Sequence, residues 1–515
     1  MREETNKTHT RLINKTIATL LVGVVFSLSA SGQQTIKGIR YTLEDNALGT
    51  TLRSIGVELD PHFHAQHVPR SAGAKVQDWD NVIVPRIKKM MPQSFRCMVM
   101  PEWYEPQNDD DDPTHINWDA LTFESTEMQG LYKVLDLAME MGVKVTLVPW
   151  GARCGSFLAP GPPGWVTVPK YLDEYAENIT ALMKHLTEKK GYTCIDELTP
   201  GNEPDGWGIS PSRYIDLCKA LQSRLESEGI LGKFKLALID NTDRGGSFDF
   251  IDGCATGLQG IADVAVSHTY IFGYETSTET VSEWEANNIH YAKGIPHFVG
   301  EFGSNLTKGS SRQTDIDWYK RGVLIVRNAI ALLGAGATGI SYWQLFDEYY
   351  SKGDNYAQMQ QLGMWKSVKA DYATEDYFDQ IAYDYQPRPQ YYAYSLLTRF
   401  IRPGAKVYPL SSDSTAKQLA RNAALAAQNE DGSWIYVVAN MEEDLPLSLC
   451  LKNSKDKVSG KFERYLYREG HLPADDDMIQ ADQDVVASRK GKLSETIPAN
   501  CVVLYRSVKK KNTTR

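Results

Sequence analysis

The chain of 515 residues carries 55 basic and 65 acidic side chains, a formal net charge of −10, and 42% of its residues are hydrophobic. This balance is typical of a globular protein, and the length predicts one domain of roughly 250–350 residues together with a smaller one. Because the net charge is negative, the composition disfavours binding to a phosphate backbone, and we expect no nucleic-acid partner.

The N-terminal segment has the three parts of a secretory signal peptide. Basic side chains extend to Lys15, residues 17–28 are almost wholly apolar, and small residues dominate 29–32. The apolar run is shorter than the ~20 residues that a membrane-spanning helix needs. No cysteine follows it for lipid attachment. We therefore expect removal of residues 1–32 and a secreted or periplasmic protein with no membrane association.

From residue 51 onward, short apolar segments alternate with segments of helical periodicity. The eight predicted strands are 54–59, 94–100, 143–148, 195–199, 234–239, 262–267, 296–300 and 338–343. The predicted helices are 79–91, 126–141, 169–189, 211–228, 247–257, 279–292, 315–333 and 389–400. Eight strand–helix units in succession predict an α/β fold, a closed (β/α)8 TIM barrel over residues 51–400. An open doubly wound sheet is disfavoured because no glycine-rich phosphate loop follows the first strand.

The pattern changes after residue 400. Brief apolar or alternating runs separated by Asp-Gly, Asn and Pro turns predict a C-terminal β-sandwich over residues 401–515. We expect a strand within residues 33–50 to join it. The seven cysteines are scattered and lack paired CxxC spacing, so we expect mostly buried thiols, with room for one or two disulfides.

Two further motifs have weak signals. The acidic run 108–112 lacks the spaced ligands and the glycine of a defined calcium loop, so a solvated loop is favoured over a cation site. The sequons at Asn178 and Asn305 indicate surface loops only if the host glycosylates proteins. We expect no metal site and no cofactor.

Two glutamates occupy the strand ends at which barrels of this type place their chemistry. Glu203 follows the fourth strand and Glu301 follows the seventh. Hydrolysis of a glycosidic bond requires a carboxylic acid that protonates the leaving oxygen and a second carboxylate across the anomeric carbon. Either glutamate alone could be a salt-bridge partner, but the pair at opposite strands of one barrel favours this reaction.

The arrangement resembles glycoside hydrolase clan A, the retaining β-glycosidases with Asn-Glu-Pro after strand four and a glutamate after strand seven. The resemblance covers residues 50–400 and includes His268-Thr-Tyr270 after strand six and Trp343 after strand eight. Families 30 and 39 are comparably similar, whereas Thr199-Pro200-Gly201 before the Asn-Glu-Pro motif departs from the usual family 5 pattern.

The resemblance implies a role for each matching residue. Glu203 would be the acid/base and Glu301 the nucleophile, and Asn202 would bind the sugar 2-hydroxyl. Tyr270 and Arg96 would contact the nucleophile and keep it ionised.

Other candidate substrate-binding residues have alternatives that the sequence leaves open. Trp343 would form the floor beneath the reacting sugar, and His268 would either bind sugar or lie behind the glutamates. Trp150 and Trp207 are sugar platforms or loop packing, and Asp205 either touches substrate or caps the following helix.

The sequence therefore predicts a secreted, monomeric, retaining glycoside hydrolase that cleaves β-linked glycans or their oligosaccharides. An inactive carbohydrate-binding barrel and a transglycosylase with the same residues are the alternatives.

Overall fold

The computed structural model describes most of the chain from residue 38 onward. The described ranges are 38–61, 79–110, 112–149, 153–156, 159–165, 172–206, 208–242, 248–306, 313, 315–353, 356–360, 362–366, 385–442, 444–450, 461–474, 477–486 and 491–508. The signal peptide expected at residues 1–32 lies outside them, as do Trp150 and Trp207.

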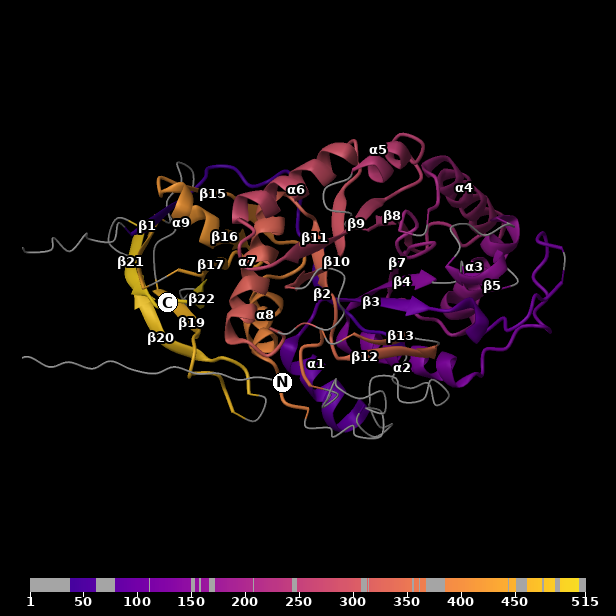
Figure 1. Ribbon diagram of the computed structural model, residues 1–515, viewed down its shortest axis with the longest axis horizontal. Helices are drawn as coiled ribbons and strands as arrows, with labels where there is room; N and C mark the ends of the chain where they lie inside the picture. Colours follow the sequence, from indigo (N-terminus) through magenta and orange to yellow (C-terminus); the bar gives the residue numbers. More distant parts are fainter. Residues whose placement is uncertain are drawn as a thin grey trace, which may run out of the picture. The chain divides into compact units, whose positions relative to one another are not determined.

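Eight parallel strands close into a barrel, which confirms the predicted fold class (Figure 1). In chain order these strands are β2 (Ser54–Glu58), β3 (Ser94–Val99), β4 (Lys144–Pro149), β7 (Ile195–Leu198), β8 (Lys235–Asn241), β9 (Val264–Phe272), β10 (His297–Asn305) and β11 (Gly339–Tyr342). The strands β2, β3 and β11 are buried along their whole length. Burial on both faces explains why these segments read as continuous apolar runs.

Helices connect successive strands and surround the barrel (Figure 1). They are α1 (Val84–Met90), α2 (Thr126–Met141), α3 (Leu172–Lys184), α4 (Pro211–Ser227), α5 (Asp249–Ala255), α6 (Thr278–Tyr291), α7 (Tyr319–Ala335) and α8 (Pro389–Phe400). Single π-helical turns extend two of them, Trp79–Ile83 before α1 and His185–Lys189 after α3. Serine side chains cap the first turns of α2, α4 and α6 by accepting from backbone N–H groups.

Two hairpins and a short 3₁₀ turn lengthen connections at the carboxyl ends of the strands. The hairpin β5 (Arg153–Ser156) and β6 (Ala159–Trp165) follows β4, and the hairpin β12 (Glu348–Gly353) and β13 (Tyr356–Gln360) follows β11. The 3₁₀ turn Pro101–Trp103 follows β3. These additions border the end of the barrel where a site is expected.

The C-terminal part consists of two sheets. The six-stranded sheet contains β14 (Lys406–Tyr408), β16 (Asn422–Gln428), β17 (Trp434–Asn440), β22 (Cys501–Ser507), β19 (Lys461–Tyr467) and β20 (Ala481–Val486). The four-stranded sheet contains β15 (Leu410–Ser412), β1 (Ile39–Leu43), β18 (Leu445–Cys450) and β21 (Lys492–Ile497). A short helix, α9 (Ala416–Arg421), precedes β16.

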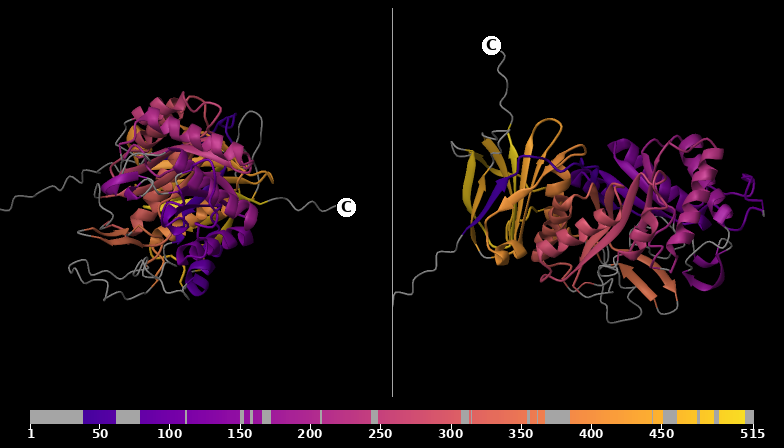
Figure 2. Two further views of the ribbon diagram at one scale, coloured as in Figure 1. Left: turned by 90° about the vertical axis from the view of Figure 1, so that its right-hand side faces the viewer. Right: turned by 90° about the horizontal axis from the view of Figure 1, so that it is seen from above.

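The strand β1 precedes the barrel in sequence but lies inside the C-terminal part. It pairs parallel with β18 and antiparallel with β15. Its indigo colour marks it among the yellow and orange strands in Figure 2. The residues expected to contribute a strand to the sandwich therefore supply an internal one.

The six-stranded sheet is covered on both faces. Trp434, Tyr436 and Val438 of β17 pack into the core between the two sheets, whereas Ile435 and Val437 belong to the core shared with the barrel helices. This alternation follows from the two-residue period of a strand. The strand β17 is accordingly buried at every position.

Tyr467 of β19 anchors this sheet to helix α7. Its ring stacks on Tyr319 with ring centroids 4.5 Å apart, and its hydroxyl donates to the Tyr319 carbonyl oxygen at 2.7 Å. Gly322, one helical turn further along, leaves the space that the tyrosine fills, because a Cβ there would lie 2.3 Å from the Tyr467 hydroxyl oxygen.

Among the described residues, no helix is both long enough and apolar enough to cross a membrane. Six of the seven cysteines have side chains that the structure describes; all six are free thiols, and five of these residues are buried.

We predict that Gly322→Ala destabilises the protein by about 1–3 kcal/mol, because the added methyl group overpacks the contact with Tyr467. Gly334→Ala in the same helix is the matched control, since its Cβ would meet only Leu425, at 3.7 Å. The control should be neutral or more stable by up to about 1 kcal/mol, as expected for removal of a helical glycine. Urea unfolding of both variants measures the difference, and equal stabilities would contradict tight packing at Tyr467.

Candidate active site

The two glutamates lie at the carboxyl ends of barrel strands, together with the residues that contact them. Glu203 follows β7, and Glu301 lies in β10. The neighbouring strand β9 places His268 beside Glu301 and Tyr270 beside Gly303 through its register with β10. The barrel therefore brings residues from distant parts of the sequence to one end of the molecule.

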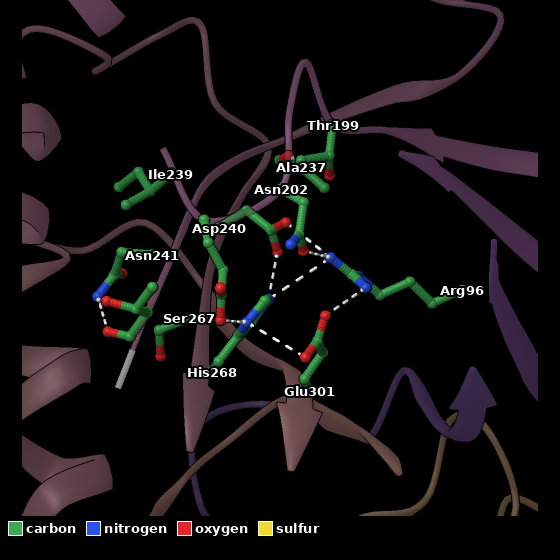
Figure 3. A network of polar contacts seen from close by, with 12 residues as sticks. Arg96, Thr199, Asn202, Ala237, Ile239, Asp240, Asn241, Ser267, His268 and Glu301 are labelled. Carbon is green, nitrogen blue, oxygen red and sulfur yellow. Dashed lines mark hydrogen bonds and ion pairs between the residues drawn. The ribbon is translucent and has the colours of Figure 1, made fainter. Parts of the chain in front are cut away.

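Arg96 of β3 is the centre of the polar network (Figure 3). Its side chain is buried, and Nη1 donates to Glu301 Oε1 at 2.7 Å and to Glu58 Oε2 at 3.0 Å. Nη2 donates to Asn202 Oδ1 at 2.7 Å and to Asp240 Oδ2 at 2.8 Å. One guanidinium thus contacts three carboxylates and orients the asparagine before Glu203.

The His268 side chain contacts both glutamates. Its Nδ1 lies 2.9 Å from Glu203 Oε1 and 3.4 Å from Glu301 Oε2, and its Nε2 lies 3.1 Å from Asp240 Oδ1. The side chain has no exposed surface. Of the two roles that the sequence left open for His268, the structure therefore favours support of the glutamates over direct contact with sugar.

The two glutamates differ in exposure and are close together. The side chain of Glu203 is 26% exposed and that of Glu301 is 5% exposed. One carboxylate oxygen of each lies within 4.8 Å of the other. Tyr270 donates its hydroxyl to Glu301 Oε2 at 2.6 Å. Glu203 is thus the more accessible carboxylate, and Glu301 is held by buried donors.

The charges of the network shift the pKa values of its members. Burial raises the pKa of Glu301 above its ordinary value, although His268, Arg96 and the Tyr270 hydroxyl act in the opposite direction. Burial alone would lower the pKa of His268, but Glu301 and Asp240 hold it well above its ordinary value. For Asp240, Arg96 and His268 outweigh burial and lower the pKa. The carboxylates around His268 therefore favour the charged form of the imidazole.

The cluster of Glu203, His268 and Glu301 has the residue types of a metal site. However, the Arg96 guanidinium already contacts Glu301, and the carboxylates around His268 favour the charged imidazole, which offers no lone pair to a metal. These two positive charges disfavour a cation between the glutamates.

Unusual backbone conformations occur where the site is assembled. Glu203 has φ 49°, Ile239 has φ 85° and Asp240 has φ 46°, all in the left-handed region that L-residues rarely adopt. The Glu203 N–H donates to the Asp240 carbonyl oxygen at 3.0 Å. Such conformations persist where surrounding contacts fix them, and they concentrate at functional sites.

The remaining predicted residues have mixed outcomes. Trp343 is buried beside Met98, Val148 and Tyr270, at the end of β11. Asp205 does not cap helix α4, because Ser210 is the capping residue. Instead, Asp205 accepts hydrogen bonds from the N–H and hydroxyl of Thr242 at 2.8 and 2.7 Å, which ties the segment after β7 to the end of β8.

Two members of the network were not predicted from the sequence, Glu58 and Asp240. Burial raises the pKa of Glu58 well above its ordinary value, and Arg96 lowers it only in part. Glu58 is the penultimate residue of the predicted strand 54–59, and Asp240 directly follows the predicted strand 234–239. That position is the signal that could have identified them, because strand ends converge in a barrel.

Solved structures share this fold. A glycoside hydrolase family 30 subfamily 8 xylanase from Clostridium acetobutylicum has a TM-score of 0.61 at 13% identity, over 91% of this chain and 99% of that one. A monomeric β-xylosidase from Caulobacter crescentus has a TM-score of 0.55 at 16% identity, over 91% and 99%. An endo-β-1,6-glucanase has a TM-score of 0.57 at 14% identity, over 92% and 94%.

No protein-family model matches the sequence, and no curated protein matches it. At these low identities the likeness to solved structures establishes the fold, a barrel with a β-rich C-terminal part.

We predict that Asp240→Asn destabilises the protein by about 3–5 kcal/mol, because it removes a buried negative charge that both Arg96 and His268 contact. The same change should lower the pKa of His268, since a neighbouring negative charge is lost. Denaturant unfolding and NMR titration of labelled histidines measure the two effects.

Asp263→Asn is the control. Asp263 directly precedes β9, at the end of the barrel away from the candidate site. The Asp263 side chain accepts one hydrogen bond from the Leu236 N–H, which the amide oxygen of asparagine can also accept. Equal stability of the two variants would argue against Asp240 as part of the charge network.

Proposed function

We propose that the chain is a retaining glycoside hydrolase that cleaves β-linked glycans or their oligosaccharides. In the first step the Glu301 carboxylate attacks the anomeric carbon while Glu203 protonates the leaving oxygen. In the second step Glu203 removes a proton from water, the water oxygen attacks the anomeric carbon, and the bond to Glu301 breaks. Asn202, which Arg96 orients, would bind the sugar 2-hydroxyl.

The separation of the glutamates carries the proposal. Retaining enzymes hold their two carboxyl groups about 5–5.5 Å apart, whereas inverting enzymes need about 6.5–9.5 Å to accommodate a water molecule. An oxygen of Glu203 lies within 4.8 Å of an oxygen of Glu301. This spacing favours direct attack by one glutamate over activation of water between them.

The surroundings suit the two roles. Glu301 receives hydrogen bonds from Arg96 and Tyr270, which favour its charged form and orient it. Glu203 is more exposed, so it can reach a leaving oxygen and then a water molecule. Barrel enzymes place their catalytic groups at the same ends of the strands.

Carbohydrate as substrate is supported by proteins that share the fold. These proteins are a xylanase, a β-xylosidase and an endo-β-1,6-glucanase. These activities differ in sugar and linkage, so the fold favours a β-glycan without selecting one.

The test is azide rescue of two variants on aryl β-glycosides and β-glycan oligosaccharides. Glu301→Ala should lose activity and, with azide, form a glycosyl azide of inverted configuration, because azide enters in place of the nucleophile. Glu203→Ala should lose about 10²–10⁴-fold on substrates with poor leaving groups. With azide it should form a product of retained configuration, because azide replaces water in the second step.

Other outcomes separate the alternatives. Wild-type activity in Glu301→Ala would remove Glu301 from the mechanism. Sugar binding by the wild-type protein without cleavage of any substrate in the panel would favour the carbohydrate-binding barrel. Longer oligosaccharides among the products would favour the transglycosylase.

We also propose that the protein is exported after removal of residues 1–32. Expression of the full-length gene in a Gram-negative host should place the protein in the periplasm or medium, with a mature chain that begins near Gln33. Intact-mass measurement of the exported protein checks this, and retention of residues 1–32 would refute it.

A further inference from the structure

A second group of carboxylates lies outside the active site. Glu105 and Asp109 belong to the segment after β3, and Glu174 and Glu177 belong to the first turns of α3. One carboxylate oxygen from each lies within 4.8 Å of the others. Both segments follow barrel strands, so the acidic cluster stands on the active-site end of the barrel (Figure 1).

Glu177 is the most unusual member of the acidic cluster. The residue is 1% exposed, and neither of its carboxylate oxygens has a hydrogen-bond partner among the described residues. A buried charge normally has both a partner and hydrogen bonds, because the loss of solvation costs several kcal/mol. Glu105, with no exposed surface, lies beside it. Glu177 thus offers two buried carboxylate oxygens that have no hydrogen-bond partner among the described residues.

The other carboxylates of the acidic cluster are oriented by surrounding groups. Asn178 Nδ2 donates to Glu105 Oε2 at 2.6 Å and accepts at Oδ1 from the Tyr104 hydroxyl at 2.6 Å. The Asn117 N–H donates to Asp109 Oδ2 at 3.0 Å. Asn178 is completely buried in α3, so the surface loop that its sequon could indicate is not present there. Outer contacts of this kind orient the ligands of metal sites.

The positive charge near the acidic cluster does not balance its four carboxylates. Arg224 of α4 lowers the pKa of Glu177 only in part, and its Nη1 donates to the Thr114 carbonyl oxygen. Burial and the neighbouring acids raise the pKa of Glu105 to about 7 and that of Glu177 to about 9. Arg224 therefore compensates the negative charge of the acidic cluster only in part.

We propose that Glu105, Asp109, Glu174 and Glu177 form a binding site for a calcium ion. Calcium takes oxygen ligands at about 2.3–2.6 Å, so ligands on opposite sides of the ion are about 5 Å apart, which the spacing in the acidic cluster allows. Magnesium requires shorter bonds and usually keeps several water molecules. Zinc prefers histidine and cysteine, which the acidic cluster lacks.

The site changes the interpretation of the acidic run at residues 108–112. The run alone lacks the spacing of a calcium loop, but the fold places Asp109 near three glutamates, Glu105 of the same segment and Glu174 and Glu177 of α3. A bound ion would join the segment after β3 to the start of α3 and so fix part of the border of the active site. This inference does not depend on the proposed glycosidase activity.

The test uses the full-length mature protein treated with EGTA and then titrated with CaCl2. Calorimetric titration should give one calcium per chain, and an excess about 100-fold over Kd should raise Tm by roughly 3–5 °C.

Glu177→Gln should abolish the calcium-induced rise in Tm, and in EGTA at pH 8 it should be at least as stable as the wild type. Glu226→Gln, at an exposed position of α4, is the control and should keep the full rise. Asp109→Asn, in a partly exposed segment, is a second variant that should weaken calcium binding.

Three results would overturn the proposal. The first is a purified protein without calcium by mass spectrometry whose Tm does not respond to CaCl2. The second is a full calcium response in Glu177→Gln. The third is a larger response to MgCl2 than to CaCl2.

Discussion

The buried guanidinium of Arg96 is the interaction on which the site depends. It contacts Glu58, Asp240 and Glu301 and orients Asn202. A buried ion of this size is stable only when its charge and its donors are matched, so the strand ends must converge closely on it. Arg96 therefore fixes the positions of Glu58, Asp240 and Glu301. His268 is a second cationic partner, in contact with Glu203, Asp240 and Glu301.

The barrel meets this requirement through its register. Glu58 pairs with Arg96 across β2 and β3, and Glu301 pairs with His268 across β10 and β9. Glu203 and Asp240 reach the network from irregular backbone after β7 and at the end of β8. Regular strands thus supply Arg96, His268, Glu58 and Glu301, while backbone with positive φ supplies Glu203 and the completely buried Asp240.

The sequence predicted the order of the elements because each local signal is strong. Helix α2 has the predicted bounds, since Ser125 caps its start and Gly142 adopts the left-handed conformation at its end. Helix α7 starts at Tyr319 instead of residue 315, because Asp315 turns back to pair with Arg321.

The site was only partly predictable. Glu203 and Glu301 lie in recognisable motifs, but Glu58 looks like one more residue of a buried strand. Asp240 directly follows a predicted strand, but its contact with Arg96 depends on the turn at the end of β8, which the sequence does not predict. The acidic cluster could not be predicted either, because Asp109 and Glu177 are far apart in the sequence and meet only in the fold. The local sequence pattern predicts helices and strands. The contacts between them can be predicted only when the strand register and the conformations of the turns are known.

The place of β1 between β15 and β18 links the two ends of the chain. A ribosome releases β1 before the barrel and both of its partners after it, so the strand must wait with unpaired backbone groups while most of the protein is made. Pairings over such long sequence separation form slowly, and open strand edges promote aggregation. The C-terminal sheets made alone would lack an internal strand, so the boundary near residue 400 is a division of architecture and not of independent folding units.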